Sequence, residues 1–141
     1  MCPSHESRAR RWVSTCDTRP SAHDFQGELK VTNLDLSQTN TKLLAIVANE
    51  RGATEALSYE QISYLGYPFS ISENFQMRNT NTTIEDSLVL LNRLVEHATS
   101  LNIELVIYLS MGFGNPYGDP WSPALVSTWV SRLVDMGVSR I

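Results

Sequence analysis

The sequence predicts an α/β fold with a parallel sheet, because strand and helix patterns alternate from Thr41 onward. The apolar runs show little alternation of apolar and polar residues, which is typical of strands covered on both faces. The segments between these runs place apolar residues at steps of three and four, the spacing of helices packed along one side. We therefore expect βαβ units.

The chain has 141 residues, of which 42% are hydrophobic and 18% charged, a composition typical of soluble globular proteins. Its formal net charge of −4 offers no general attraction to phosphate backbones or anionic membranes, so we expect no nucleic-acid or membrane partner. No apolar run approaches the roughly 18 residues of a membrane span, and the amino terminus lacks the order of a secretory signal. We expect a cytoplasmic protein.

Residues 1–32 differ from the rest because they are rich in arginine and have no periodic apolar positions. Four side chains there offer metal-ligand atoms, but their spacing matches no standard zinc pattern: Cys2, His5, Cys16 and His23. A transit peptide is an alternative, although the acidic residues in this stretch count against it. We expect a disordered or aberrant segment over residues 1–32 and a partial domain over residues 33–141.

Three strands and a short helix are expected in the first part of this domain. Residues 42–49 form the first apolar run, residues 52–57 are a helical candidate, and residues 62–71 form the second strand. Pro68 lies inside this second run, and proline removes a ladder donor, so we expect a bulge or the start of the strand near it. Residues 103–109 form the third strand.

Two amphipathic helices are expected around the third strand. Thr82 and Glu85 have the spacing of a capping box, and the helix that follows buries one stripe: Ile84, Leu88, Leu91, Val95 and Ala98. Ser122 and Pro123 are a typical helix start, and the inner stripe of the second helix comprises Val126, Val130, Leu133 and Val134. Gly137 ends this helix, and residues 138–141 begin a further strand.

Polar side chains follow each of the three expected strands, at the sheet edge where α/β proteins place their chemistry. The candidates are Asn49, Ser72, Glu73, Tyr108 and Ser110. Asn49 is equally well explained as a turn residue before a helix. Gln76 and Arg78 are interpreted as residues of a solvated loop, and His97 as a half-buried surface residue of a helix.

Three further features are given structural interpretations. The segment Gly112–Gly118 lacks the third glycine of a dinucleotide cradle at the required spacing, and Pro116 interrupts it. We therefore expect no nucleotide cofactor there. Trp121 and Trp129 are interpreted as packing residues.

Two strand-end segments carry a resemblance to a known family. Phe69-Ser-Ile-Ser-Glu-Asn-Phe-Gln76 and Tyr108-Leu-Ser110 resemble consecutive strand ends of hydroxymethylglutaryl-CoA lyases of the bacterial type, over roughly residues 33–141. The resemblance implies an incomplete (β/α)₈ TIM barrel, about strands 3 to 6, of the metal-dependent pyruvate carboxyltransferase-like group of lyases and synthases. It implies a carbon–carbon lyase that cleaves 3-hydroxy-3-methylglutaryl-CoA to acetoacetate and acetyl-CoA.

The resemblance also implies the roles of particular residues. It makes Asn49, Ser72, Glu73, Tyr108 and Ser110 substrate-binding residues for an acyl-CoA, and it implies a divalent cation, usually Mg²⁺. Family members carry an Arg-Asp pair on the first strand and a His-x-His on a later strand, and neither motif occurs in this sequence. We therefore assign no catalytic or metal-binding residue and expect this fragment alone to be inactive. The reactive cysteine of animal members is replaced by Asn115.

Three readings of the chain stay open. The chain is either the recognisable part of a lyase or a non-catalytic remnant or interaction fragment of a barrel enzyme, and a related acyl-CoA Claisen-type lyase or synthase is the other enzyme reading. An incomplete sheet exposes strand edges, here residues 43–48 and 138–141, so we expect self-association.

Overall fold

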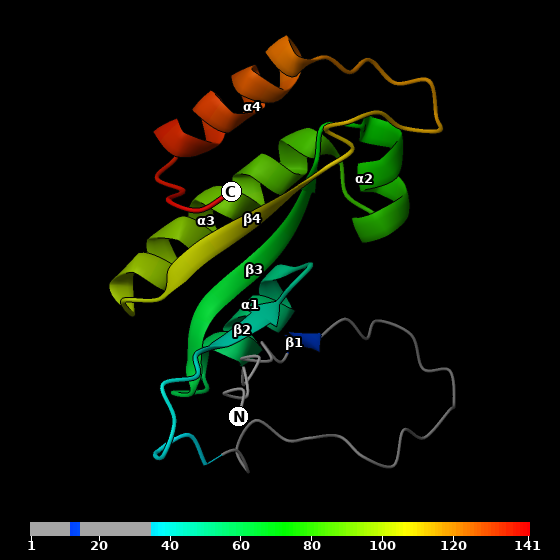
Figure 1. Cartoon of the computed structure of the whole chain (residues 1–141). Coiled ribbons are helices and arrows are strands. Elements are labelled where there is room, and N and C mark those ends of the chain that lie inside the picture. Colours follow the sequence, from blue (N-terminus) through cyan, green and yellow to red (C-terminus); the bar gives the residue numbers. More distant parts are fainter. Residues whose placement is uncertain (1–11, 15–34) are drawn as a thin grey trace, which may run out of the picture.

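The computed structural model describes residues 12–14 and 35–141, and these form an α/β fold (Figure 1). The disorder expected over residues 1–32 therefore concerns residues that lie largely outside the described part. One strand, β1 (Trp12–Ser14), falls within this stretch and is not predicted by the sequence pattern. None of the described helices is long and apolar enough to cross a membrane.

The sheet has four parallel strands in the order β1-β2-β3-β4, which confirms the α/β prediction. The other three strands are β2 (Leu43–Ile46), β3 (Ile62–Ser70) and β4 (Glu104–Ser110). Because β1 pairs with β2, the expectation that β2 is an edge strand was wrong. Residues 138–141 form no strand, although Arg140 makes a parallel bridge to Val106 of β4.

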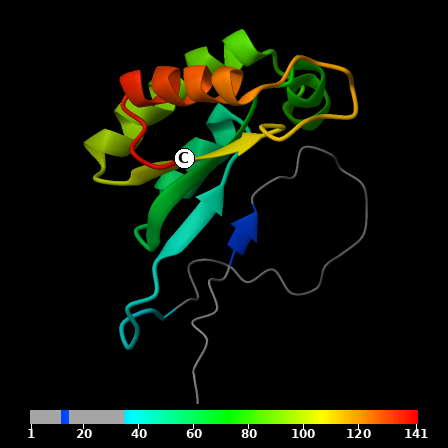
Figure 2. The ribbon, with the colours of Figure 1, turned by 45° about the horizontal axis from the view of Figure 1, so that its top comes forward.

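Helices α1 (Glu50–Leu57), α3 (Ile84–Ser100) and α4 (Pro123–Asp135) lie on one face of the sheet (Figure 2). The core lies between these helices and the strands: alternate residues of β3, Leu65, Tyr67 and Phe69, are fully buried. Phe69 packs on Trp129 of α4, with ring centroids 5.4 Å apart. The expected packing role of Trp129 is therefore confirmed, whereas Trp121 is half exposed.

Helix α3 begins one residue later than the expected capping box. Thr83 is the N-cap, its hydroxyl oxygen accepts from the Asp86 N–H at 3.0 Å, and its hydroxyl donates to the Asp86 carboxylate at 2.7 Å. Thr82 instead donates to the Thr80 carbonyl. The shift does not move the buried stripe, because Ile84, Leu88 and Leu91 all reach the core.

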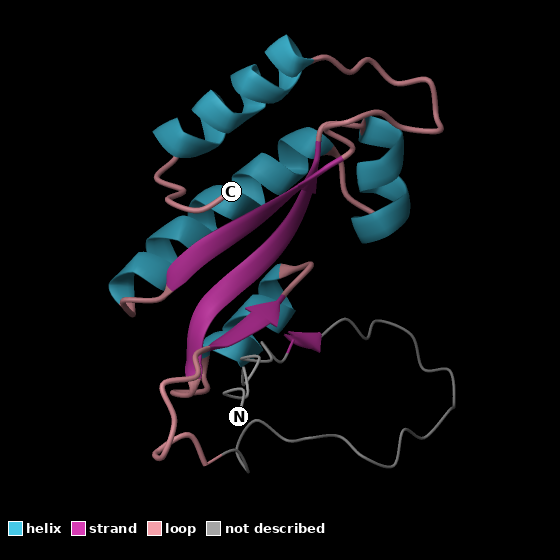
Figure 3. Ribbon diagram, viewed as in Figure 1, coloured by secondary structure: helices cyan, strands magenta, loops and turns pink. Residues whose placement is uncertain are grey.

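The apolar stripe of α4 is only partly as expected. Leu133 is fully buried, but Val134, expected on the inner side, is 54% exposed. The side of the helix that packs on the sheet passes through Trp129 and Leu133, which are four residues apart. Val134 follows Leu133 directly, so its side chain points about 100° away round the helix, toward solvent. Helix α4 as a whole lies on the β4 side of the sheet, away from β1 (Figure 3).

Pro68 causes neither a bulge nor a strand end, so that expectation was wrong. Strand β3 continues through Pro68, which pairs in register with Tyr108 of β4. The Val47 N–H donates to the Gly66 carbonyl at 2.8 Å, so by alternation the backbone nitrogen of Pro68 faces the same side, beyond the end of β2. The pairing of β2 with β3 ends at this point, since the next donor toward β2 would be the backbone nitrogen of Pro68, which carries no hydrogen. The irregularity in pairing lies instead between Leu43 and Leu44.

The face of the sheet opposite the helices carries the even-numbered residues of β4 and those of β3 from Tyr64 onward. Among them, Tyr64 and Tyr108 are half-buried. A Cβ atom on Gly66 would lie 2.8 Å from Leu44 and 3.0 Å from the ring of Tyr108. The absence of a side chain at Gly66 is thus what lets the Tyr108 ring lie across the middle of the sheet.

Candidate functional site

The carboxyl ends of β3 and β4 meet at one edge of the sheet, since the strands are parallel. Ser70 and Ser110 are register partners, and the Ile71 N–H donates to the Ser110 carbonyl at 3.2 Å. The Ser70 hydroxyl accepts from the Ser72 N–H at 3.0 Å. Two of the predicted segments are therefore held together at this edge by backbone and serine hydrogen bonds.

Ser72 is fully buried and is the N-cap of helix α2 (Glu73–Thr80). Its hydroxyl oxygen accepts from the Phe75 N–H at 3.1 Å, and the hydroxyl donates to the Asp119 carboxylate at 2.5 Å. A serine hydroxyl has one proton and two lone pairs. Its proton is therefore already used within the chain, and the remaining lone pair is covered, because Ser72 is fully buried.

Asp119, which the sequence patterns did not indicate, organises this edge from the loop after β4. Besides Ser72, its carboxylate accepts from the Asn74 backbone N–H at 3.1 Å and from the Asn74 side chain at 2.7 Å. These bonds, that from Ser72 first, hold the pKa of Asp119 below its ordinary value. The resulting contribution to stability is present above about pH 4 and is lost as the pH falls through the lowered pKa.

Asn49 and Glu73 both satisfy helix amino termini. Asn49 caps α1, with its side-chain oxygen accepting from the Gly52 N–H at 2.8 Å, as in the turn interpretation of the sequence. Glu73, in the first turn of α2, accepts from the Ile84 N–H at the start of α3 at 3.1 Å. Each cap supplies one of the partners that helix ends lack. Substrate binding by these two residues stays a prediction.

Gln76 is a core residue of α2, so its interpretation as part of a solvated loop was wrong. It is 1% exposed, and its side-chain oxygen accepts from the Ser70 N–H at 2.8 Å. Its amide nitrogen donates to the hydroxyls of Thr80 and Ser87, at 3.1 Å and 2.8 Å. Gln76 thus joins the end of β3 to α2 and α3. The spacing of four residues between Gln76 and Thr80 was the available signal.

Arg78 lies on the outer side of α2, and its guanidinium lies 5.2 Å from the ring centroid of Tyr117 in the loop after β4. Phe75 also contacts Tyr117, with ring centroids 6.5 Å apart. Arg78 is therefore a helix residue that helps attach this loop to α2, and its interpretation as part of a solvated loop was wrong.

Tyr108 lies on the sheet face opposite the helices, two residues before Ser110. Its hydroxyl oxygen is buried, and burial raises the pKa of the phenol above its ordinary value. The group is therefore a neutral hydrogen-bonding group at physiological pH. His97, by contrast, is exposed on α3, more so than the half-buried position expected.

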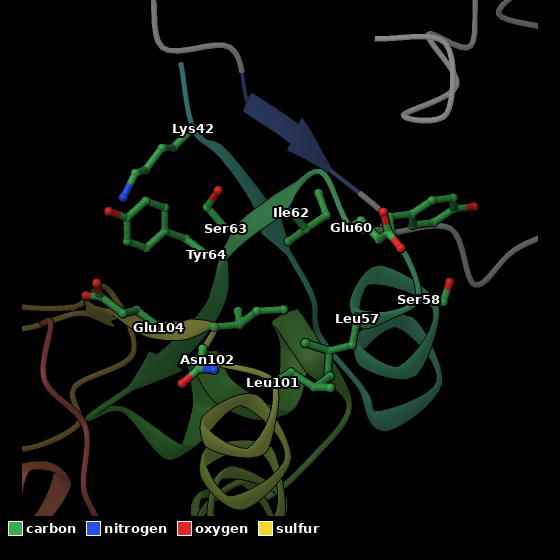
Figure 4. A pocket seen from close by; sticks show the side chains of 12 residues that line it. Lys42, Leu57, Ser58, Glu60, Ile62, Ser63, Tyr64, Leu101, Asn102 and Glu104 are labelled. Atoms are coloured by element: carbon green, nitrogen blue, oxygen red, sulfur yellow. The ribbon is translucent and has the colours of Figure 1, made fainter. Parts of the chain in front are cut away.

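A cleft of about 490 Å³ lies at the other end of the sheet (Figure 4). It is lined by the beginnings of β3 and β4 and the ends of α1 and α3, and Lys42 extends toward the ring of Tyr64 there, 5.6 Å from its centroid. Glu104 is paired with Arg140 at the same end. In parallel α/β barrels, active sites lie at the carboxyl ends of the strands. This cleft lies at the opposite, amino end, so it is not the candidate site.

Within residues 35–141, no three or more His, Cys, Asp or Glu side chains gather closely enough to hold a metal ion. The carboxylate of Asp119 is occupied by Ser72 and Asn74, and that of Glu73 by the start of α3. The side chains of the described part therefore do not fit the divalent cation that the resemblance implies.

The fold and the polar strand ends define part of a (β/α)₈ barrel with its candidate site on the carboxyl rim. No family model matches the chain. Curated relatives do match it, and they are hydroxymethylglutaryl-CoA lyases. The mitochondrial hydroxymethylglutaryl-CoA lyase of Pongo abelii is 32% identical over 89 residues, 63% of this chain and 26% of the relative. The human cytoplasmic 3-hydroxy-3-methylglutaryl-CoA lyase is 34% identical over 90 residues, 64% of this chain and 22% of the relative.

Solved structures give the same result. The lyase of Bacillus subtilis superposes with a TM-score of 0.64 and 29% identity, over 70% of this chain and 33% of that structure. An Acinetobacter lyase, solved with coenzyme A and 3-methylmalate, has a TM-score of 0.64 at 19% identity, over 71% of this chain and 32% of that structure, and shows the fold alone. The chain is hydroxymethylglutaryl-CoA lyase-like and spans about a quarter of the length of the curated relatives it matches.

Proposed function

We propose that residues 35–141 are the part of a hydroxymethylglutaryl-CoA lyase barrel that binds the acyl portion of 3-hydroxy-3-methylglutaryl-CoA. One observation carries the proposal: the two segments that resemble the lyases, around Ser72 and around Tyr108, lie at the ends of adjacent strands. These strands, β3 and β4, pair continuously from Tyr64 with Glu104 to Ser70 with Ser110. Segments 36 residues apart in sequence thereby meet at one rim. The similarity to curated lyases supports the substrate class.

The proposed reaction is a retro-Claisen cleavage. The proton of the substrate's 3-hydroxyl leaves, the C2–C3 bond breaks with its electron pair passing to C2, and protonation of C2 gives acetyl-CoA. C3 becomes the ketone of acetoacetate. The hydroxyls of Tyr108 and Ser110 would hydrogen-bond the polar groups of the acyl portion, with Asn49, Ser72 and Glu73 completing the rim.

The alternative function is that of a non-catalytic remnant or interaction fragment. It is favoured by the missing Arg-Asp and His-x-His motifs and by the lack of fit for a metal ion within residues 35–141. Mg²⁺ dependence and a cytoplasmic location stay predictions from the sequence. The curated relatives include lyases named as mitochondrial and as cytoplasmic.

The proposed function is tested with the purified chain, 3-hydroxy-3-methylglutaryl-CoA and Mg²⁺. We expect binding of the substrate, measured by calorimetry, without acetoacetate above background, because the catalytic arginine and metal ligands of the family have no counterpart in the sequence. The Tyr108→Phe variant should bind more weakly and His97→Ala should bind as the unaltered chain does. Turnover by this polypeptide would contradict the division of the site, and the absence of binding would contradict the acyl-binding role.

The outer edge of β4 predicts self-association. Ile107 donates to the Arg140 carbonyl on this side, and by alternation the N–H of Leu109 faces the same edge, where no described residue pairs with it. Unpaired strand edges recruit further strands. Sedimentation velocity over a dilution series should show a concentration-dependent oligomer. A monodisperse monomer at every concentration would contradict this expectation.

A further inference from the structure

The loop from Met111 to Ser122 is attached to helix α2 at several points. The Asp119 carboxylate receives three hydrogen bonds from Ser72 and Asn74, at the amino terminus of the helix. Further along α2, the ring of Tyr117 contacts Phe75, the next residue, and Arg78, one turn beyond Asn74. The loop is therefore fastened to the rim of the candidate site.

Asn115 gives this loop its shape. Its side-chain oxygen accepts from the N–H groups of Tyr117 and Asp119, both at 3.0 Å, and its amide donates to the Asp119 carbonyl at 2.8 Å. The backbone around Asp119 is thus held within the loop by one side chain, while the Asp119 carboxylate reaches out to α2. Asn115 therefore shapes the loop, and Asp119 attaches the loop to α2.

We propose that Asp119 is a positioning residue of the candidate site, which fastens the 111–122 loop to α2 and directs the Ser72 hydroxyl proton toward this loop. Because Ser72 is fully buried and its proton is engaged, a bound acyl-CoA reaches this hydroxyl only when the loop is released. A ligand group that requires a donor from Ser72 must therefore displace Asp119. Release of the loop and donation from Ser72 to a ligand both require the hydrogen bond between Ser72 and Asp119 to break, so the two events are coupled. The significance for acyl-CoA binding rests on the proposed function, whereas the positioning itself does not.

Amide hydrogen exchange of the full chain, without ligand, tests the positioning. The Asn74 N–H reports the bond to Asp119, and the Phe75 N–H reports the bond to Ser72. Asp119→Ala should accelerate exchange at both amides by roughly tenfold or more, because both bonds depend on the carboxylate. Asp135→Asn, a change of an exposed aspartate at the end of α4, should leave both rates unaltered. Leu91 in α3 serves as an internal reference for global unfolding.

A double-mutant comparison shows whether Asp119 acts through Ser72. In a Ser72→Ala background, Asp119→Ala should add little to exchange at Phe75. In the Ser72→Ala single variant, the carboxyl pKa of Asp119, followed by carbon NMR, should rise toward its ordinary value. Unaltered exchange at Asn74 and Phe75 in Asp119→Ala would overturn the proposal. An equal effect of Asp119→Ala on exchange at Phe75 with and without the Ser72 hydroxyl would overturn it too. Because no substrate is used, neither result depends on whether the chain binds 3-hydroxy-3-methylglutaryl-CoA.

Discussion

Replacing Gln76 by leucine is expected to lower the free energy of unfolding by about 2–3 kcal/mol. Leucine fills a similar volume, but it leaves the Ser70 N–H without its acceptor and the Ser87 hydroxyl without a donor. Gln76 is 1% exposed and Ser70 is fully buried, so water does not replace the lost partner at Ser70. Urea unfolding followed by circular dichroism measures the change.

Gln38→Leu is the matched control. Gln38 is exposed and, among the described residues, its amide donates to neighbouring Ser37 at 3.5 Å, so its replacement should change the stability by less than about 0.5 kcal/mol. If Gln76→Leu does not fold, Ser87→Ala provides a milder test, with an expected loss of about 1 kcal/mol. Equal stability of the Gln76 and Gln38 variants would contradict the structural role of the buried amide.

The order and type of the main elements were predictable because they depend on local patterns. The apolar runs of β2, β3 and β4 and the buried stripe of α3 each lie within one segment, so spacing alone reveals them. The N-cap role of Ser122 depends on a neighbouring residue, since its hydroxyl oxygen accepts from the Leu125 N–H at 3.0 Å. These features involve contacts over a few residues only.

The rest depends on contacts between distant segments. Helix α2 has few apolar residues, and its inward residue is Gln76, whose burial is satisfied by partners on β3 and α3. The strand β1 is three residues long and pairs in parallel register with β2, which lies about 30 residues further along the chain. A polarity pattern does not show either feature, because both are tertiary.

The candidate site illustrates the same division. Polar residues at the strand ends, such as Ser72 and Ser110, follow from the sequence order of strands and helices. That Ser72 donates to Asp119, which lies 47 positions away, follows only from the folded loop. A serine or asparagine after a strand can cap a helix as well as bind a ligand, and Ser72 and Asn49 both act as caps.

We propose that this chain carries the acyl-binding part of a lyase site, and transplantation places it in a complete barrel where this role can be measured. Residues 41–141 would replace the matching segment of the Bacillus subtilis lyase, whose structure superposes on this chain with a TM-score of 0.64. The chimaera should retain lyase activity. Ser72→Ala would be compared with Asp119→Ala, since both changes remove the same hydrogen bond.

The most direct measurement is kcat/KM of the chimaera with Tyr108→Phe, which removes one hydroxyl oxygen and leaves the ring packed against Gly66. We expect a reduction of roughly tenfold or more, the effect of losing a hydrogen bond to a charged substrate group. His97→Ala, on the exposed side of α3, should leave kcat/KM unchanged. An active chimaera in which Tyr108→Phe and Ser72→Ala both leave kcat/KM unchanged would contradict the acyl-binding role of this rim.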